Sequence, residues 1–153
     1  MTGAPIDPLA VEAQVCLTVS AAARSLVGFY RPLLAPLGLT HPQYLAMLAL
    51  WQYGSLSLTA LAGHLHLEPA TTSPLVKRLE AMGLVHRGRD EVDERALVIA
   101  LTDAGRALRA SAVDIPATMV ARLGLDQEQI EEIRRAAELL VAACASASAR
   151  VGD

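Results

Sequence analysis

The sequence predicts a mainly α-helical chain with one small β-hairpin, arranged as a winged helix-turn-helix between N- and C-terminal helices. Helical patterning covers most of the 153 residues, because apolar side chains recur at spacings of three and four. The pattern changes once, where the segments LVHRGR and ALVIAL flank the charged loop DEVDER and are typical of two short strands. Since two short helices and a turn directly precede this hairpin, the order of elements is that of a winged helix.

A long helix is expected at the N-terminus, over 9–34, before the break at APLGLTHPQ. Small and apolar residues recur along it every seven positions, with a second set four positions after the first. The two sets are Leu9, Cys16, Ala23 and Tyr30, and Ala13, Ser20, Val27 and Leu34. This spacing predicts a seam that packs against another helix.

The elements of the winged region, 40–101, follow from their start and stop signals. Thr40 or His41 can cap a largely apolar core helix that runs to about Tyr53. Ser57 or Thr59 opens a short helix, and after the turn LEPA a further helix runs to Met82 and stops at glycine. The proline at position 74 costs a hydrogen bond unless it lies in the first turn, so this helix begins either just after position 73 or earlier, at position 69.

Two more helices are expected after the hairpin. Thr102 caps the first, which Pro116 kinks or interrupts and which ends near Gly124. Asp126 and Gln129 resemble a capping box for a last helix that runs to about residue 149. Its apolar positions form a second seam: Ile130, Ile133, Ala137, Leu140, Cys144 and Ala147. Two seams in one short chain predict a homodimer built from 9–35 and 103–149.

Composition limits the classes of protein that remain. Hydrophobic residues make up 53% of the chain and charged residues 19%, so one folded domain is expected and intrinsic disorder is not. The net charge of −3 speaks against indiscriminate binding of polyanions. The longest unbroken apolar stretch within 32–67 has seven residues, too few for a membrane span. Two cysteines imply no disulfide framework and no signal peptide is visible, so a cytoplasmic protein is expected.

A specific resemblance begins at LVKRLEAMGLVHRGRDEVDERALVIALTDAG, residues 75–105. The helix that ends in glycine, the strand, the Asp-x-Arg wing and the LT-x-x-G start of the next helix resemble the MarR family of bacterial transcriptional regulators. The segments EAQVCL, FYRPLLAPLGLTHPQYLAMLALW and AVDIPATM are similar to the OhrR-type branch, which senses organic hydroperoxides through one N-terminal cysteine. The resemblance implies one MarR-type domain over 1–153, a homodimeric repressor, and a recognition helix that starts at the earlier position, Pro69.

Candidate DNA-contacting residues lie on the expected recognition helix and hairpin. They are Thr71, Thr72, Ser73, Lys77, Arg78, Arg87, Arg89, Asp93 and Arg95. The hydroxyl residues can reach base edges, and the basic residues suit phosphates. As the family implies, Arg95 enters the minor groove and Asp93 orients it. Residues 77–95 hold five basic and five acidic side chains, so the residues alone also allow a solvated surface; the resemblance favours a pseudo-palindromic operator with half-sites about 10 bp apart or a multiple of that.

The candidate redox sensor is Cys16. Taken alone, a cysteine on an apolar helix stripe is more often a small buried hydrophobe, and the resemblance favours the sensor. Tyr30 lies 14 residues further along, which is about 21 Å on one helix. If the tyrosine hydrogen-bonds the thiolate, as the family implies, it therefore comes from the other subunit. The branch carries tyrosines where this chain has Ser20 and His41. Either His41 replaces the lost hydrogen-bond donor and, if protonated, favours the thiolate more than a phenol does, or the sensor is retuned or lost.

In the favoured hypothesis an organic hydroperoxide oxidises the cysteine to a sulfenic acid, which can condense with a small thiol, and the repressor then leaves its operator. The alternatives are a MarR-type regulator released by a small apolar or phenolic ligand, and a thiol peroxidase. Zinc sensing through His64 and His66 has little support because residues two apart on a helix diverge. Cys144 is expected to pack in a core, with a bridge to Cys16 as a minority hypothesis. No enzyme motif, metal site or cofactor is expected.

Overall fold

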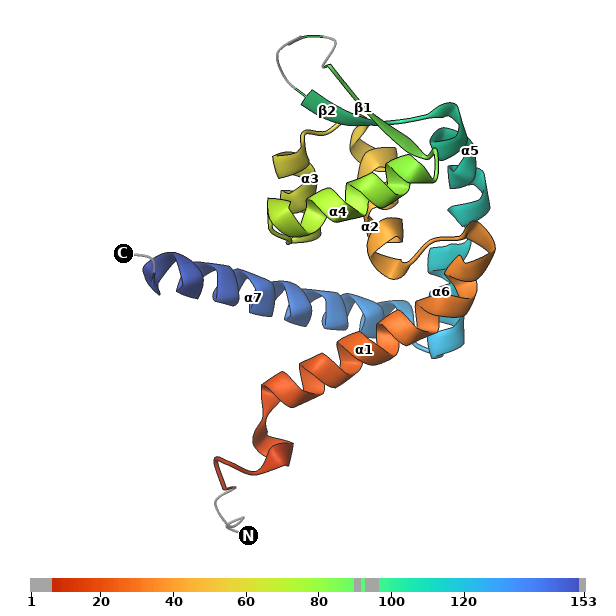
Figure 1. The fold of residues 1–153 in the computed structure, drawn as a ribbon. Helices are drawn as coiled ribbons and strands as arrows, with labels where there is room; N and C mark the ends of the chain where they lie inside the picture. The colour runs from red at the N-terminus through yellow and green to blue at the C-terminus, as the bar shows by residue number, and fades with distance from the viewer. Residues whose placement is uncertain (1–6, 90–91, 93–96, 152–153) are drawn as a thin grey trace. The chain divides into compact units, whose positions relative to one another are not determined.

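The computed structural model describes residues 7–89, 92 and 97–151, and the chain divides into two compact units, Met1–Val113 and Asp114–Asp153. The elements of the first, N-terminal unit are, in order, η1 (Val11–Ala13), α1 (Val15–Leu34), η2 (Ala35–Leu37), α2 (His41–Tyr53), α3 (Leu58–Leu65), α4 (Pro69–Ala81), β1 (Val85–Arg89), β2 (Leu97–Leu101) and α5 (Asp103–Ala112). The second, C-terminal unit contains α6 (Ile115–Leu123) and α7 (Gln127–Val151) (Figure 1). The prediction of a mainly helical chain with one hairpin is confirmed.

The core of the N-terminal unit lies between α2, α3, α4 and the hairpin. Its largest fully buried side chains are Tyr44, Leu34, Met47, Leu50, Leu61, Leu79, Val76, Val85 and Thr72. α2 and α4 supply three of these each, and Thr40 caps α2 through a capping box with Gln43. The predicted core helix is therefore confirmed.

The hairpin is antiparallel, with Val85 opposite Leu101 and Arg89 opposite Leu97. A single bridge joins Leu56 to Ile99 on the other edge of β2, so β2 is hydrogen-bonded on both sides. Thr102 then starts α5, as predicted: its side chain accepts a hydrogen bond from the backbone N–H of Gly105.

The first helix begins later than the sequence predicts. Residues 11–13 form a 3₁₀ turn, and α1 starts at Val15 because the backbone of Gln14 is extended. The Gln14 side-chain amide donates to the carbonyl oxygens of Pro8 and Ala10, and the Asp7 carboxylate accepts from the backbone N–H of Leu9. These side-chain hydrogen bonds replace the backbone bonds of a continuous helix.

The first predicted seam is also only partly exposed. Its members Tyr30 and Leu34 pack within their own chain, Tyr30 half-buried and Leu34 at 1% exposure. A different stripe on α1 leaves its apolar side chains exposed, at spacings of four, three, four and three: Val15, Val19, Ala22, Leu26 and Phe29. This stripe is exposed in a single chain, and it has the spacing of a helix–helix contact.

The C-terminal unit has the predicted start signal. The Asp126 carboxylate accepts from the Gln129 backbone N–H at 2.8 Å, and the Gln129 side chain accepts from the Asp126 N–H at 3.0 Å. α7 then runs two residues past the predicted end at 149 and carries ion pairs of Arg134 and Arg135 with Glu131. The seam positions Ile133 and Leu140 are exposed, at 55% and 37%.

Among the described residues, no single helix has the length and apolar character of a membrane span. Only Val15–Leu37 taken together with His41–Tyr53, across a bend of 70°, meets those criteria as a pair.

Candidate functional site

The helix-turn-helix is formed by α3 and α4, and side-chain and backbone caps fix the turn between them. The Ser57 hydroxyl accepts from the Ala60 N–H at 3.1 Å and starts α3. α3 ends at Leu65 and is capped by His66, whose φ of 53° lies in the left-handed region, and the Leu67 N–H then donates to the Ala62 carbonyl at 3.0 Å. This bond closes the helix end and directs the chain into α4 at Pro69.

α4 starts at Pro69, as the resemblance implies, with Pro74 inside the helix. Thr71, Lys77 and Arg78 are exposed and Ser73 is half-buried, so the helix presents hydroxyl groups followed by cations along one part of its surface. Thr72 does not belong to that surface. Its side chain is 0% exposed, and its hydroxyl donates to the carbonyl of Glu68 at 3.0 Å. The expectation that Thr72 touches DNA is therefore corrected: this side chain packs in the core.

The hairpin brings Arg87 and Arg89 onto one face of β1, because alternate strand residues point the same way. Arg87 Nε lies 3.6 Å from Glu80 Oε2, and the Glu80 carboxylate also accepts from the Arg87 backbone N–H at 3.4 Å. Glu80 thus ties the first strand to α4. Asp93 and Arg95, the predicted wing residues, lie outside the described residues.

The base of the hairpin is fastened by residues that sequence reasoning did not single out for this task. The Thr102 hydroxyl donates to the Gly83 carbonyl at 2.6 Å, and Trp51 Nε1 donates to the Gly105 carbonyl at 2.9 Å. A Cβ on Gly105 would lie 2.0 Å from the Leu84 carbonyl oxygen. The glycine of the LT-x-x-G motif is therefore required for the close approach of α5 to the start of β1.

The cysteine site begins at the N-terminus of α1. Cys16 is the second residue of this helix and is exposed, as is Ser20 one turn later. The unpaired backbone N–H groups of a helix N-terminus favour a negative charge nearby. Tyr30 lies on the same uninterrupted helix, so Cys16 and Tyr30 are separated by almost four turns within one chain.

Tyr30 lies in an aromatic cluster with His41 and Tyr44. The ring centroid of Tyr30 is 4.9 Å from that of His41 and 5.8 Å from that of Tyr44. Burial raises the pKa of Tyr30 and lowers the pKa of His41 from its ordinary value of 6.5. Burial, followed by the nearby Tyr30, also raises the pKa of Tyr44. Both phenols and the imidazole are therefore neutral at pH 7, and His41 is not the cation that would favour a thiolate.

Tyr44 was not singled out from the sequence, although its place three residues after His41 on an expected helix puts the two on neighbouring turns. Cys144, which the sequence places on the packing seam of the last helix, is exposed on α7 in a single chain. Within the part of the chain that the structure describes, no group of three or more His, Cys, Asp or Glu side chains could hold a metal ion.

Comparison with known proteins places these features in a family. Residues 39–97 match the MarR family. The organic hydroperoxide resistance transcriptional regulator of Bacillus subtilis (strain 168) is 40% identical over 129 residues, which are 84% of this chain and 86% of that protein. The HTH-type transcriptional regulator TtmR of Methylorubrum extorquens (strain PA1) is 42% identical over 123 residues, 80% of this chain and 63% of that protein.

Among solved structures, reduced AbfR bound to DNA is similar to this chain with a TM-score of 0.73 and 31% identity, over 89% of this chain and 93% of AbfR. AbfR is a protein of Staphylococcus epidermidis and has also been solved in an overoxidized form bound to DNA and in a disulfide form. These relatives are regulators and not enzymes. The chain therefore belongs to the MarR family and is a transcriptional regulator with a winged helix-turn-helix.

Proposed function

We propose that the protein is a homodimeric, sequence-specific repressor that leaves its operator when an organic hydroperoxide oxidises Cys16. The observation that carries this proposal is the exposed cysteine at the N-terminus of α1, in a chain that is 40% identical to an organic hydroperoxide resistance regulator. Such a regulator acts on chromosomal DNA, in the cytoplasm.

Operator binding would use the exposed side chains of α4 together with the hairpin. Thr71 and Ser73 are close enough to the start of the helix to reach base edges, while Lys77, Arg78 and Arg89 suit phosphates. Asp93 and Arg95 are proposed for the minor groove, as in the family. Arg87 contributes less than a solvated arginine would, because Glu80 already neutralises part of its charge.

The exposed stripes supply the dimer contact. A single chain leaves Val19, Leu26 and Phe29 of α1 and Ile133 and Leu140 of α7 in contact with water, each at 37% exposure or more. Association would bury this apolar surface at about 25 cal/mol per Å². Two recognition helices related by two-fold symmetry then read a pseudo-palindromic operator.

Oxidation follows a balanced two-electron step. The Cys16 thiolate attacks one peroxide oxygen, the O–O bond breaks, and the alkoxide that leaves takes a proton and becomes an alcohol. Sulfur is oxidised to the sulfenic acid while the peroxide is reduced. A small thiol can then displace the sulfenic oxygen as water and leave a mixed disulfide. A neutral Tyr30 from the partner subunit is a hydrogen-bond donor for the thiolate, whereas the neutral His41 holds the Tyr30 ring from the side.

Release of DNA requires the oxidised interface to favour a different spacing of the two DNA-binding regions. A shift from 99% bound to 99% free needs about 5.5 kcal/mol of differential stability. Two changes within the dimer contact contribute to this free-energy difference: the larger volume of the oxidised side chain and the loss of the hydrogen bond to the thiolate.

A gel shift with the protein's own upstream DNA tests the proposal, with and without cumene hydroperoxide. Wild type and Cys144→Ser, which removes the other exposed cysteine, should both lose the shift, while Cys16→Ser should keep it. Release of Cys16→Ser by peroxide would overturn the redox mechanism and favour a ligand-released regulator. Catalytic rather than stoichiometric consumption of peroxide would indicate a thiol peroxidase.

A further inference from the structure

Glu80 is a carboxylate in the last turn of α4, the helix proposed to contact DNA. It follows Ser73 and Lys77 at spacings of seven and three, which places the three side chains on one face of the helix. An acidic side chain is unfavourable in the last turn of a helix and beside phosphates, because both the helix C-terminus and the DNA backbone are negative. Neither helix stability nor attraction to DNA therefore explains a glutamate at this position.

Two contacts with Arg87 hold Glu80 against β1. The carboxylate oxygen Oε1 accepts from the Arg87 backbone N–H at 3.4 Å, and Oε2 lies 3.6 Å from Arg87 Nε. Within the described part of the chain, this carboxylate pairs with Arg87 and not with Lys77, although Lys77 lies one turn before it on the same helix. Glu80 therefore ties the backbone of β1 to α4 and also occupies the Arg87 guanidinium.

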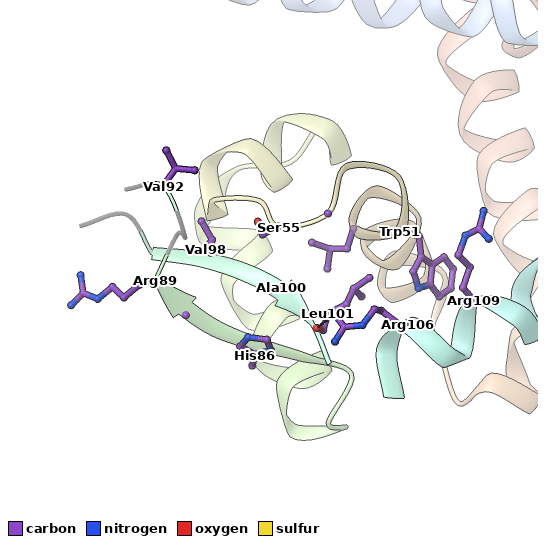
Figure 2. Close-up of a pocket in the computed structure, with 13 residues that line it drawn as sticks. Trp51, Ser55, His86, Arg89, Val92, Val98, Ala100, Leu101, Arg106 and Arg109 are labelled. Carbon is purple, nitrogen blue, oxygen red and sulfur yellow. Dashed lines mark hydrogen bonds between the residues drawn. The ribbon is translucent and has the colours of Figure 1, made fainter. Parts of the chain in front are cut away.

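Arg87 lies on the side of the hairpin that faces α4. Figure 2 shows the opposite side of β1, where His86 lines a pocket together with Ala100 and Trp51. Because successive strand residues point to opposite faces, Arg87 points away from this pocket, and its contact with Glu80 agrees with that direction. The guanidinium of Arg87 therefore lies beside the proposed DNA-contacting face of α4.

The ion pair between Glu80 and Arg87 is loose enough to be exchanged. The two side chains are 42% and 40% exposed, and the distance of 3.6 Å between Nε and Oε2 is longer than the roughly 2.7–2.9 Å of a strong charge-assisted hydrogen bond. Such an exposed pair adds little to stability, so its main effect is on the availability of Arg87. A phosphate can replace Glu80 at the guanidinium, but it must break the existing contact to do so.

We propose that Glu80 is a specificity-determining residue for DNA binding, because it keeps Arg87 from pairing freely with the phosphates of any sequence. At an operator the base contacts of α4 fix the protein on the DNA, so a more mobile guanidinium gains little there. On other DNA no base contact fixes the register, and a released Arg87 pairs with whichever phosphate is nearest. Glu80 therefore lowers the affinity for other sequences more than the affinity for the operator. This inference rests on the proposed contact of α4 and β1 with DNA and is independent of Cys16.

Fluorescence anisotropy tests the proposal with two duplexes, the protein's own upstream DNA and a scrambled duplex of the same composition, over a series of salt concentrations. Glu80→Gln removes the charge but keeps an acceptor for the Arg87 N–H. It should bind the scrambled duplex at least about threefold more tightly, because the competing ion pair is lost. The slope of log affinity against log salt should steepen by about two for a dimer that gains two phosphate contacts. The preference for the upstream DNA should fall by about the same factor of three.

Two further variants assign the effect to this pair. Glu132→Gln makes the same change of charge at an exposed position of α7, outside the elements proposed to contact DNA, and should bind both duplexes like wild type. In an Arg87→Gln background, Glu80→Gln should change neither the salt slope nor the preference, because no guanidinium remains to be released. Thermal unfolding verifies that each variant is folded.

An unchanged preference in Glu80→Gln would overturn the proposal, as would equal changes in Glu80→Gln and Glu132→Gln. A gain that persists in the Arg87→Gln background would also overturn it, because the carboxylate would then act on DNA directly and not through Arg87. If wild type itself showed no preference for the upstream DNA, the proposed operator binding would fail, and this inference with it. If wild type shows that preference and Glu80→Gln keeps it in full, only the role of Glu80 is refuted.

Discussion

Gly105 lies so close to the backbone of Leu84 that a methyl group has no room between them. In Gly105→Ala the new Cβ would begin 2.0 Å from a backbone oxygen, so α5 or the start of β1 must shift. We expect the free energy of unfolding to fall by about 2 kcal/mol or more, measured by denaturant titration.

Gly63→Ala is the matched control for this change. Gly63 is exposed inside α3, and a Cβ there would meet nothing within 4 Å. The same methyl group should stabilise the protein by up to about 1 kcal/mol, because alanine favours a helix interior. Equal effects of the two substitutions would contradict the steric argument.

His41 makes a pH-dependent contribution to stability. Burial against Tyr30 lowers the pKa of the folded imidazole below its ordinary value of 6.5. The unfolded chain therefore binds a proton first, so this contribution is complete above about pH 6.5 and is lost as the pH falls through the folded pKa. The stability of the wild type should fall more than that of His41→Gln between about pH 7 and pH 5, as followed by thermal unfolding. If the stability of the two proteins fell equally over this pH range, the assignment of the effect to His41 would be contradicted.

Thr72 shows which residue-scale features the sequence could have predicted. It stands three and four residues before Leu75 and Val76, on the apolar face of α4, and its burial follows from that phase. Its polar side chain led to the opposite expectation. The approach of Gly105 to Leu84 joins segments about 20 residues apart in the chain, and no local pattern reports a distance between such segments.

At the scale of elements, prediction worked wherever a cap or a proline decides the boundary. Thr40, Ser57, Thr102 and Asp126 each start a helix as the sequence predicts. The start of α1 was wrong because Gln14 bonds backward to Pro8 and Ala10 rather than along the helix. Glutamine has no strong preference for bonding backward to the preceding turn, so the sequence does not predict that the helix starts only at Val15.

The proposed contact of α4 with phosphates has a measurable consequence. Lys77 is exposed and takes part in no ion pair with the described residues. Each phosphate contact contributes about 0.9 to the slope of log affinity against log salt concentration. Lys77→Ala should therefore lower the magnitude of this slope by about two for a dimer that loses two contacts, measured by fluorescence anisotropy with operator DNA. Arg122→Ala, which removes an exposed cation from α6, should leave the slope unchanged.

At the scale of the whole molecule, the sequence predicts terminal helices that pack against a second copy, but it does not select the face of α1. Several stripes along this helix are apolar at heptad spacing, because alanine, valine and leucine residues occur on most of its faces. Packing within the chain decides which stripe stays exposed. Leu34 is buried and Tyr30 is half-buried, whereas the stripe that contains Leu26 remains in contact with water. Periodicity alone cannot distinguish a stripe that packs inside a chain from one that packs between chains.

Dimerisation through this stripe predicts a clean separation between two positions on one helix. Leu26 is 42% exposed at the centre of the stripe, and Arg24 lies on the opposite side of α1 by helical periodicity. A glutamate at position 26 would bury a charge without a partner, at a cost of several kcal/mol, whereas one at position 24 stays in water. Leu26→Glu should therefore sediment as a monomer at concentrations where wild type and Arg24→Glu are dimers. A monomer has one recognition helix instead of two, so Leu26→Glu should also lose operator affinity even though its hairpin and α4 are intact. If Leu26→Glu remained a dimer, the dimer contact would have to lie on another face of α1.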